Sequence, residues 1–390
     1  MIMICTMKLN RLFLVSVPAL CLAFSSCSSG SRKAAADDDH IGLTTKTLQI
    51  PSSDVLNLKS YYLSCTCRKD TSEWLYAYNY KEHALDRFDL HSLGSMQIPL
   101  AVEGASAVVR PISGLYVCSP DSIWVYDAAQ KALLLDGKGQ VLRSVPLAAG
   151  LSSGQAVMIE RNYAISTTPL YYDAHRRSLL FGIRDASGPL VAFKAREYFL
   201  DTGRATDVPL PASVDVPHVA EGDYADMSRP NLTFTAEKIV CNYPVESHIY
   251  VIDRRSGQTD VFEAPSRFTA NKAEPCRSRT DYTQWERHRV ENPHFYELMY
   301  LPASGRYVRL HTAGQMYDAS KKLMDQLLEK RFFLTLFDHD FSVLDEEELP
   351  AHRYNIFTGW CPSSDALLFY VDHPLSGGEE TEELMIDCIE

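Results

Sequence analysis

Beyond residue 45 the chain is a succession of short segments in which apolar and polar residues alternate. Alternation with a period of two predicts strands that bury one face. One unit recurs, consisting of a strand that ends in Asp, a polar turn, a second strand and often a Pro. Its copies are "WVYDAAQKALLLDGKGQVLRSVPL" (124–147), "YFLDTGRATDVPLP" (198–211), "YVIDRRSGQTDVFEAP" (250–265), "LTLFDHDFSVLDEEELP" (334–350) and the looser "LDRFDLHSLGSMQIPL" (85–100). An Asp at such a position bonds its own turn backbone, so we interpret these Asp residues as structural.

A second unit, a hairpin, precedes the first or lies inside it. It occurs as "YYDAHRRSLLF" (171–181), "YLPASGRYVRL" (300–310) and "WCPSSDALLFYV" (360–371). Pairing the two units gives six groups, at residues 52–100, 101–147, 158–211, 230–265, 295–350 and 352–390. Repeats of about 40–50 residues with four strands each are typical of a β-propeller, so we predict an all-β, six-bladed β-propeller over residues 46–390. The last group lacks one strand, which the alternating "KTLQI" (46–50) supplies. A pair of β-sandwiches is the alternative.

One segment has the periodicity of a helix. In "DASKKLMDQLLEKR" (318–331) the apolar residues fall on one face and the charged residues on the other. We therefore expect one inserted amphipathic helix, packed on the edge of the propeller.

The first 26 residues have the pattern of a signal peptide. Lys8 and Arg11 precede the apolar run "LFLVSVPALCLAF" (12–24), and the small residues Ser25 and Ser26 follow it. The run is too short for a membrane-spanning helix. Residues 27–45 are small, polar and charged, as in a flexible tether. The acidic "DDDH" (37–40) is interpreted as a solvated run rather than a metal site.

The segment "FSSCSS" (24–29) resembles the lipobox of bacterial lipoproteins, in the relaxed form found in Bacteroidetes. The resemblance implies cleavage before Cys27 and attachment of a diacylglycerol to its thiol. Phe24 departs from the stricter motif, which prefers Leu. An ordinary secretory cleavage or an uncleaved anchor is the alternative. Orientation toward the periplasm or the cell exterior stays open.

Charge and cysteine content narrow the classes of partner and chemistry. The net charge is −12, and loss of the two positive charges of the leader makes it −14, which argues against a nucleic-acid partner. Seven cysteines follow Cys27. Their odd number and scattered positions do not match the disulfide framework of a small secreted protein. In "CTC" (65–67) the two thiols share one face of a strand, so we interpret them as buried together. We expect no cofactor and leave a divalent ion open.

The sequence contains no phosphate-binding glycine loop, HExxH, CxxC or GxSxG motif. Ligands of propellers usually meet the loops around the channel, so the two long insertions are the candidate binding segments. The first, 216–231, offers Arg229 together with His218, Glu221, Asp223, Tyr224 and Asp226. The second, 281–297, offers Trp285, Arg287 and His288, with Arg289 and His294. Trp285 beside two arginines suits stacking on a sugar or binding of an acidic group. A solvated loop with Trp285 packed on the edge is the alternative.

Two further sets of residues are candidates for the channel itself. His352, Arg353, Tyr354 and Asn355 open the sixth group, and Asn242 and Tyr243 lie in the fourth. Burial against the neighbouring blade is the alternative interpretation for both sets.

Taken with the lipobox and tether, the chain resembles a family of Bacteroidetes lipoproteins that carry a six-bladed, TolB-like propeller of unknown function. The resemblance rests on "CNYPVESHIYVIDRRSG" (241–257) and "AHRYNIFTGW" (351–360), and no catalytic residue is implied by it. We therefore expect a lipid-anchored outer-membrane propeller that binds a ligand, an envelope protein or a glycan. The alternative is a hydrolase or lactonase-like enzyme with a metal site at the channel mouth. Fold alone does not decide between them.

Overall fold

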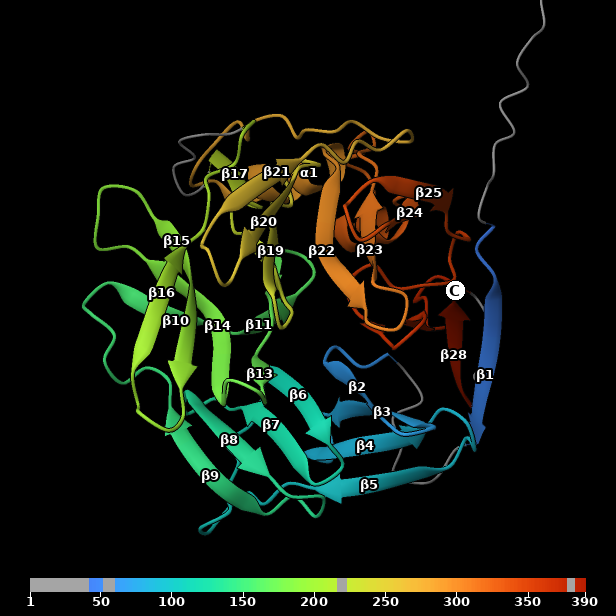
Figure 1. Ribbon diagram of the computed structural model, residues 1–390. Helices are drawn as coiled ribbons and strands as arrows, with labels where there is room; N and C mark the ends of the chain where they lie inside the picture. Colours follow the sequence, from blue (N-terminus) through green and yellow to red (C-terminus); the bar gives the residue numbers. More distant parts are fainter. Residues whose placement is uncertain (1–41, 52–59, 216–222, 377–382) are drawn as a thin grey trace, which may run out of the picture. The chain divides into compact units, whose positions relative to one another are not determined.

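The computed structural model describes residues 42–51, 60–215, 223–376 and 383–390. The chain divides into two units, residues 1–39 and 40–390, and every described residue belongs to the second. In this part of the chain, six antiparallel sheets of four or five strands follow one another around a common centre (Figure 1). The six-bladed β-propeller is therefore confirmed.

The first three blades follow the predicted order along the chain. Blade one contains β2 (Ser64–Lys69), β3 (Ser72–Asn79), β4 (Ala84–Asp89) and β5 (Ser95–Pro99). Blade two contains β6 (Gly114–Ser119), β7 (Ser122–Tyr126), β8 (Lys131–Leu135) and β9 (Val141–Pro146). Blade three contains β10 (Gln155–Met158), β13 (Tyr171–Asp173), β14 (Ser178–Asp185), β15 (Ala192–Phe199) and β16 (Ala205–Pro209).

The last three blades complete the ring. Blade four contains β18 (Asn231–Phe234), β19 (Lys238–Asn242), β20 (Ile249–Asp253) and β21 (Thr259–Phe262), preceded by the short β17 (Asp223–Asp226). Blade five contains β22 (His294–Leu301), β23 (Arg306–Thr312), β24 (Phe332–Phe337) and β25 (Val343–Glu348). Blade six contains β26 (Trp360–Pro362), β27 (Leu367–Tyr370), β28 (Glu383–Ile389) and, from the other end of the described chain, β1 (Thr45–Pro51).

Strand β1 closes the ring as the sequence predicts. It pairs antiparallel with β28, from Thr45 opposite Ile389 to Pro51 opposite Glu383. Leu48 and Ile50 are buried against the core while their neighbours in β1 are exposed, which is the alternation on which the prediction depended. Closure of this kind leaves no blade without a partner.

The inner edge of blade three is interrupted, which the sequence does not predict. Strands β10 and β13 pair with opposite ends of the same strand, β14. Between them the chain forms a hairpin of β11 (Glu160–Asn162) and β12 (Ser166–Thr168). The tip of the hairpin reaches the centre of the ring, where the backbone N–H of Thr167 donates to Oδ1 of Asn231 over 2.7 Å. The hairpin therefore occupies part of the axial channel.

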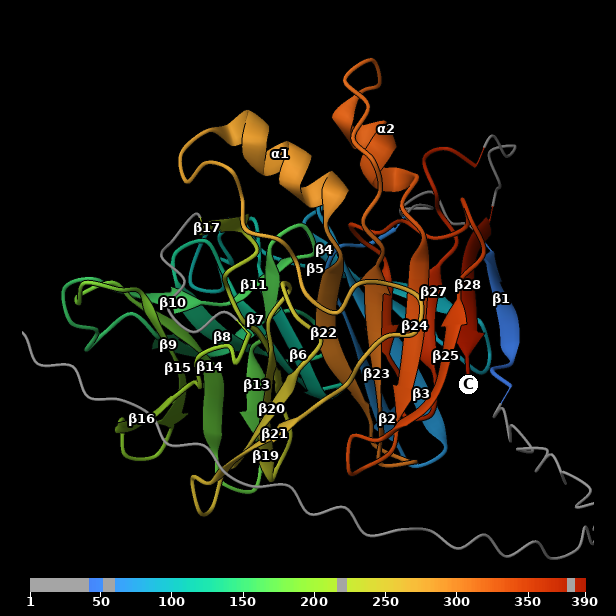
Figure 2. The ribbon, with the colours of Figure 1, turned by 90° about the horizontal axis from the view of Figure 1, so that it is seen from above.

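The prediction of a single helix was incomplete, because two short helices lie on one face of the ring (Figure 2). Helix α1 (Tyr282–Glu291) falls in an insertion that was interpreted as a loop. The Asp281 side chain caps it by accepting from the N–H of Thr283 over 2.9 Å, a start signal that is visible in the sequence. Helix α2 (Leu323–Leu328) is shorter than the predicted 318–331, because Asp318 instead bonds the local backbone at Ser320.

The Asp residues at the strand ends have the structural role expected of them. Oδ1 of Asp253 accepts from the N–H groups of Arg255 and Ser256, and Oδ1 of Asp338 accepts from those of Asp340 and Ser342. The core lies between neighbouring blades, where apolar faces of successive sheets pack together. Cys67 is buried in one of these clusters and Cys65 packs against it, as predicted for "CTC".

Candidate functional site

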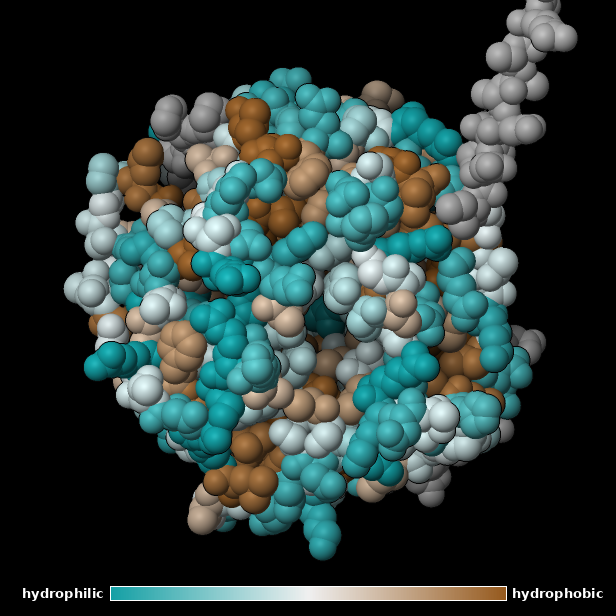
Figure 3. Space-filling view, in the orientation of Figure 1, coloured by the Kyte–Doolittle hydropathy of each residue, from teal (hydrophilic) through white to brown (hydrophobic). Residues whose placement is uncertain are grey.

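A cavity of about 420 Å³ lies at the centre of the ring. Residues of the innermost strand of every blade line it, together with the hairpin β11–β12. Ala236, Pro302 and Ser363, at or just beyond the ends of three inner strands, are among its lining residues. Since α1 precedes the start of β22, these strand ends mark the face opposite the helices. Figure 3 shows a hollow in the middle of that face.

The wall of the cavity is mainly apolar. Leucine, phenylalanine, methionine and tyrosine side chains from five of the six blades form most of it: Leu63, Leu115, Tyr116, Leu170, Tyr171, Leu232, Phe234, Leu298, Met299 and Tyr300. The thiols of Cys65 and Cys361 also line it. Burial raises the pKa of both thiols, in Cys361 to about 12, so both are uncharged at neutral pH.

A charged pair interrupts this apolar wall. Nη2 of Arg161, in the hairpin, lies 3.6 Å from Oε1 of Glu297 on β22. Arg161 also donates from Nη1 to the carbonyl oxygen of Ser64 over 2.8 Å, and Trp360 donates from Nε1 to Oε1 of Glu297 over 3.2 Å. Burial raises the pKa of Glu297, although the positive charge of Arg161 opposes this effect.

Beside this pair the Thr167 side chain interacts with the Glu297 carboxylate. Oε2 of Glu297 and Oγ1 of Thr167 are both buried. Both residues line the cavity. Buried polar groups are usually hydrogen-bonded, and these two are the polar groups that a molecule entering the cavity would meet at its charged end.

On the helix side of the pair, aromatic side chains fill the channel. The ring of Tyr163, at the hairpin tip, lies 3.7 Å from that of Trp360, and Tyr296 packs against both. All three side chains are buried. We therefore describe the cavity as a cup, with the Arg161–Glu297 pair at its floor and its mouth on the face away from the helices.

Among the predicted residues, Arg229 contacts a residue of the cavity wall. Its Nη1 is 3.3 Å from Oε1 of Glu160, which lines the cavity beside Arg161. Arg229 does not itself line the cavity, so it contacts the site through Glu160.

Of the predicted residues of the second insertion, four lie on α1 and His294 begins β22, and none of the five lines the cavity. Trp285 donates from Nε1 to the carbonyl oxygen of Ser278 over 3.0 Å, and Arg287 pairs with Glu291. Nε2 of His288 is 2.6 Å from the carbonyl oxygen of Glu274, and burial lowers the pKa of this ring. Arg287 and His288 line a separate polar pocket of about 200 Å³.

Asn242 and Tyr243 connect segments rather than line the cavity. Asn242 donates from Nδ2 to the carbonyl oxygen of Tyr296 over 2.9 Å and so joins blade four to blade five. The hydroxyl of Tyr243 donates to the carbonyl oxygen of Pro211 over 2.7 Å.

His352, Arg353 and Tyr354 lie in the turn before β26 and face the closing blade. Arg353 donates from Nε to Oδ2 of Asp387 over 2.6 Å, and the Tyr354 hydroxyl donates to the same oxygen over 2.6 Å. His352 is exposed and its ring stacks on that of His373 at 5.1 Å. Arg353 and Tyr354 therefore contact blade six, and none of the three residues lines the cavity.

Several sequence-based candidates lie outside the described residues. These are the expected lipid attachment at Cys27, the tether up to residue 41, and His218 and Glu221 of the first insertion. Within the described ranges no helix is long and apolar enough to cross a bilayer.

Side chains that could bind a metal ion lie together outside the cavity. Among the described residues, the one cluster of three or more such side chains is Asp215, Glu246 and His248, and none of these lines the cavity.

The sequence analysis missed the two charged residues of the floor. Glu297 is the lone charge in the strand "HFYELMYL", and a single carboxylate in an apolar strand is a signal of a buried functional charge. Arg161 gives no comparable signal, because the hairpin that carries it was not predicted.

Comparisons with known proteins support the fold and leave the activity open. Residues 201–348 match the family described as "Domain of unknown function (DUF4221)". A crystal structure of a DUF4221 member from Bacteroides vulgatus ATCC 8482 is similar, with a TM-score of 0.68 at 15% identity over 89% of this chain and 98% of that one. No curated protein sequence matches.

Two further solved structures resemble the chain more distantly. One is a protein from Bacteroides fragilis NCTC 9343 described as exported, with a TM-score of 0.47 at 11% identity over 89% of this chain and 95% of that one. The other is the calcium-binding protein regucalcin from Agrobacterium tumefaciens C58, with a TM-score of 0.44 at 12% identity over 87% and 93%. Residues 201–348 are thus similar to DUF4221, and the chain shares its fold with a crystallised member of that family.

Proposed function

We propose that the protein is a non-enzymatic binding module, held at the bacterial envelope by a lipid on Cys27, whose axial cup takes a small and largely apolar ligand with one polar end. The observation that carries the proposal is the buried Glu297 carboxylate, with the Thr167 side chain beside it, at the floor of an apolar cup. A ligand hydroxyl or amide at the floor would bind both side chains, since it can donate to the carboxylate and accept from the hydroxyl.

The dimensions and composition of the cup support this function. Its volume of about 420 Å³ falls within the range of roughly 300–1,000 Å³ that is usual for small-molecule sites. Such sites are mostly apolar and hold a few polar groups that orient the ligand. The cup has this composition, with its charged pair at one end.

The chemistry of the lining favours binding over catalysis. No histidine is among the cavity-lining residues that the structure describes, and the two lining thiols are held uncharged. The two carboxylates of the wall, Glu160 and Glu297, are each paired with an arginine rather than with a histidine or a thiol. The alternative of a metal-dependent hydrolase gains no support from the cup, because the Asp215, Glu246 and His248 cluster lies outside it.

A fluorescence titration tests the proposal. The neutral probe N-phenyl-1-naphthylamine is added to the chain from residue 40 onward, the unit that contains the whole propeller. Saturable binding of one probe per chain is expected. Ala236→Trp places a large ring at the mouth, where Ala236 is exposed and lines the cavity, and we expect it to abolish binding.

Ala205→Trp is the matched control, because Ala205 is exposed on the outermost strand of blade three and far from the mouth. It should bind the probe as the original chain does. Equal binding by the Ala236→Trp and Ala205→Trp variants would refute the cup as the site.

A further inference from the structure

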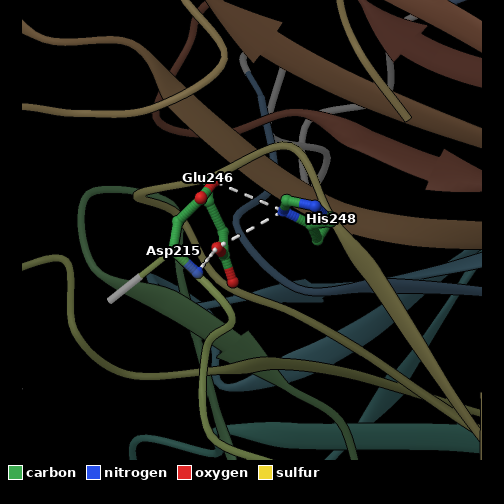
Figure 4. A group of neighbouring side chains, drawn as sticks. All are labelled: Asp215, Glu246 and His248. Atoms are coloured by element: carbon green, nitrogen blue, oxygen red, sulfur yellow. Dashed lines mark hydrogen bonds and ion pairs between the residues drawn. The ribbon is translucent and has the colours of Figure 1, made fainter. Parts of the chain in front are cut away.

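Three side chains with metal-binding chemistry meet on the helix-bearing side of blade four. Asp215 lies in the connection between blades three and four, while Glu246 and His248 lie in the turn between β19 and β20. Their donor atoms all lie within 4.8 Å of one another. Figure 4 shows the His248 ring directed at both carboxylates.

The distances in this cluster match those around one tetrahedral ion. Nδ1 of His248 is 3.4 Å from Oδ2 of Asp215 and 3.5 Å from Oε2 of Glu246. Zinc binds imidazole nitrogen and carboxylate oxygen at about 2.0–2.2 Å, so two donors on a tetrahedral zinc ion lie about 3.4 Å apart. Calcium and magnesium select oxygen donors, and a histidine ligand disfavours them.

The histidine nitrogen is otherwise unused. Nδ1 of His248 is buried and makes no hydrogen bond within the described part of the chain, although two carboxylates face it. A nitrogen atom that faces two carboxylate oxygens at these distances has the surroundings of a metal ligand.

Glu246 is fixed by neighbours that leave it able to bind an ion. It is fully buried, and its Oε1 accepts from the Tyr250 hydroxyl over 2.5 Å. Its Oε2 accepts from the backbone N–H of Asp215 over 3.1 Å, which brings the two carboxylates together. Such bonds from surrounding residues orient metal ligands and raise affinity. Nζ of Lys272 donates to the carbonyl oxygen of Asp215 over 2.7 Å and so is directed at the backbone.

We propose that Asp215, Glu246 and His248 form a zinc site with three protein ligands, which fastens the connection between blades three and four to the β19–β20 turn. Three ligands leave a fourth position for water or a partner group. The site is independent of the cup, since none of its residues lines the cavity.

Calorimetric titration of the full, untagged chain with zinc chloride, after removal of metal with a chelator, tests the site. One equivalent should bind. His248→Ala and Asp215→Asn should each weaken the binding more than tenfold, and zinc should raise the Tm of the original chain but not of these variants. Both positions are less buried than Glu246, so both variants are expected to fold.

A matched control is available elsewhere on the surface. His339 lies 3.1 Å from Asp340, and both side chains are about three-quarters exposed. His339→Ala removes a histidine beside a carboxylate and should leave zinc binding unchanged. Cobalt added in place of zinc should give the visible absorption of a tetrahedral site, which His248→Ala abolishes. Absence of saturable binding, or equal binding by His248→Ala and the original chain, would overturn the proposal.

Discussion

Nη2 of Arg161 lies 3.6 Å from Oε1 of Glu297, and this pair joins an inserted hairpin to an inner strand at the floor of the cup. Arg161 lies in the two-stranded hairpin between β10 and β13, and Glu297 lies in blade five. Their meeting gives an apolar cavity a charged end that can select the polar group of a ligand. The pair is therefore the first place where substitution should change binding without closing the cavity.

Glu297→Gln should change which probes bind. The substitution leaves the positive charge of Arg161 unbalanced in a buried site, so an anion gains attraction there. We expect 1-anilinonaphthalene-8-sulfonate to bind about tenfold more tightly, equivalent to about 1.4 kcal/mol, and neutral N-phenyl-1-naphthylamine to change little. The control for loss of a charge is Glu237→Gln, because Glu237 is exposed and lies next to the mouth. Equal changes for both probes would show that the pair does not face the ligand.

Asp387→Asn should weaken closure of the ring. The carboxylate accepts from Thr47 on β1 over 2.6 Å and from both Arg353 and Tyr354. We expect the free energy of unfolding to fall by about 2 kcal/mol or more, less than for a fully buried pair because the Arg353 side chain is 34% exposed. Urea denaturation measures the change. Thr45→Val, at an exposed position of the same strand, should have no comparable effect.

Asp387 should also contribute to loss of stability in acid. Burial alone would raise its pKa, but the hydrogen bonds from Arg353, Thr47 and Tyr354 outweigh burial and hold the pKa below the ordinary value of 3.8. The contribution is thus complete above pH 3.8 and is lost as the pH falls through the lower, folded-state pKa. The free energy of unfolding should be measured at several pH values from pH 5 downward. It should fall less steeply with decreasing pH in Asp387→Asn than in the original chain. An identical acid dependence in both proteins would contradict this account.

Because of Lys330, the free energy of unfolding should rise with pH above neutrality. The buried ammonium group of Lys330 donates to the carbonyl oxygens of Arg289 and Asn292 over 2.7 Å each, and burial lowers its pKa from 10.5 to about 7. Between pH 7 and 10.5 the unfolded chain binds a proton that the folded chain does not. The free energy of unfolding therefore rises with pH there, by up to about 1.4 kcal/mol per unit.

Lys330→Met tests this pH dependence. The substitution should reduce the slope of unfolding free energy against pH between pH 7 and 10.5, as measured by urea denaturation at several pH values. Lys138→Met, at an exposed lysine, should leave the slope unchanged. A slope that is the same in the Lys330→Met variant and in the original chain would show that Lys330 is charged when buried.

The lipid anchor gives a prediction that does not depend on the cup. Mass spectrometry of the chain purified from bacterial envelopes should find an N-terminal Cys27 that carries a diacylglycerol. Cys27→Ser should move the protein from the membrane fraction to the soluble fraction. A chain that begins at another residue, or that stays with the membrane after substitution, would contradict the anchor.

The sequence predicted the ring better than the site, for a physical reason. Alternation along each strand is a local pattern, so the blades and the closure by β1 follow from the positions of residues such as Leu48 and Ile50. The floor of the cup depends on contacts between distant segments. Arg161 reaches Glu297 only because the hairpin β11–β12 leaves blade three, and that departure has no local signature. Helix α1 was missed although Asp281 caps it, because its residues are mostly polar.

A crystal structure of the propeller with N-phenyl-1-naphthylamine bound tests the central claim most directly. We expect one probe in the cup, with its rings against Phe234 and Leu298 and its amine directed at Glu297. Probe bound only on the outer surface, with the same occupancy in the Ala236→Trp variant, would contradict the assignment of the cup as the binding site.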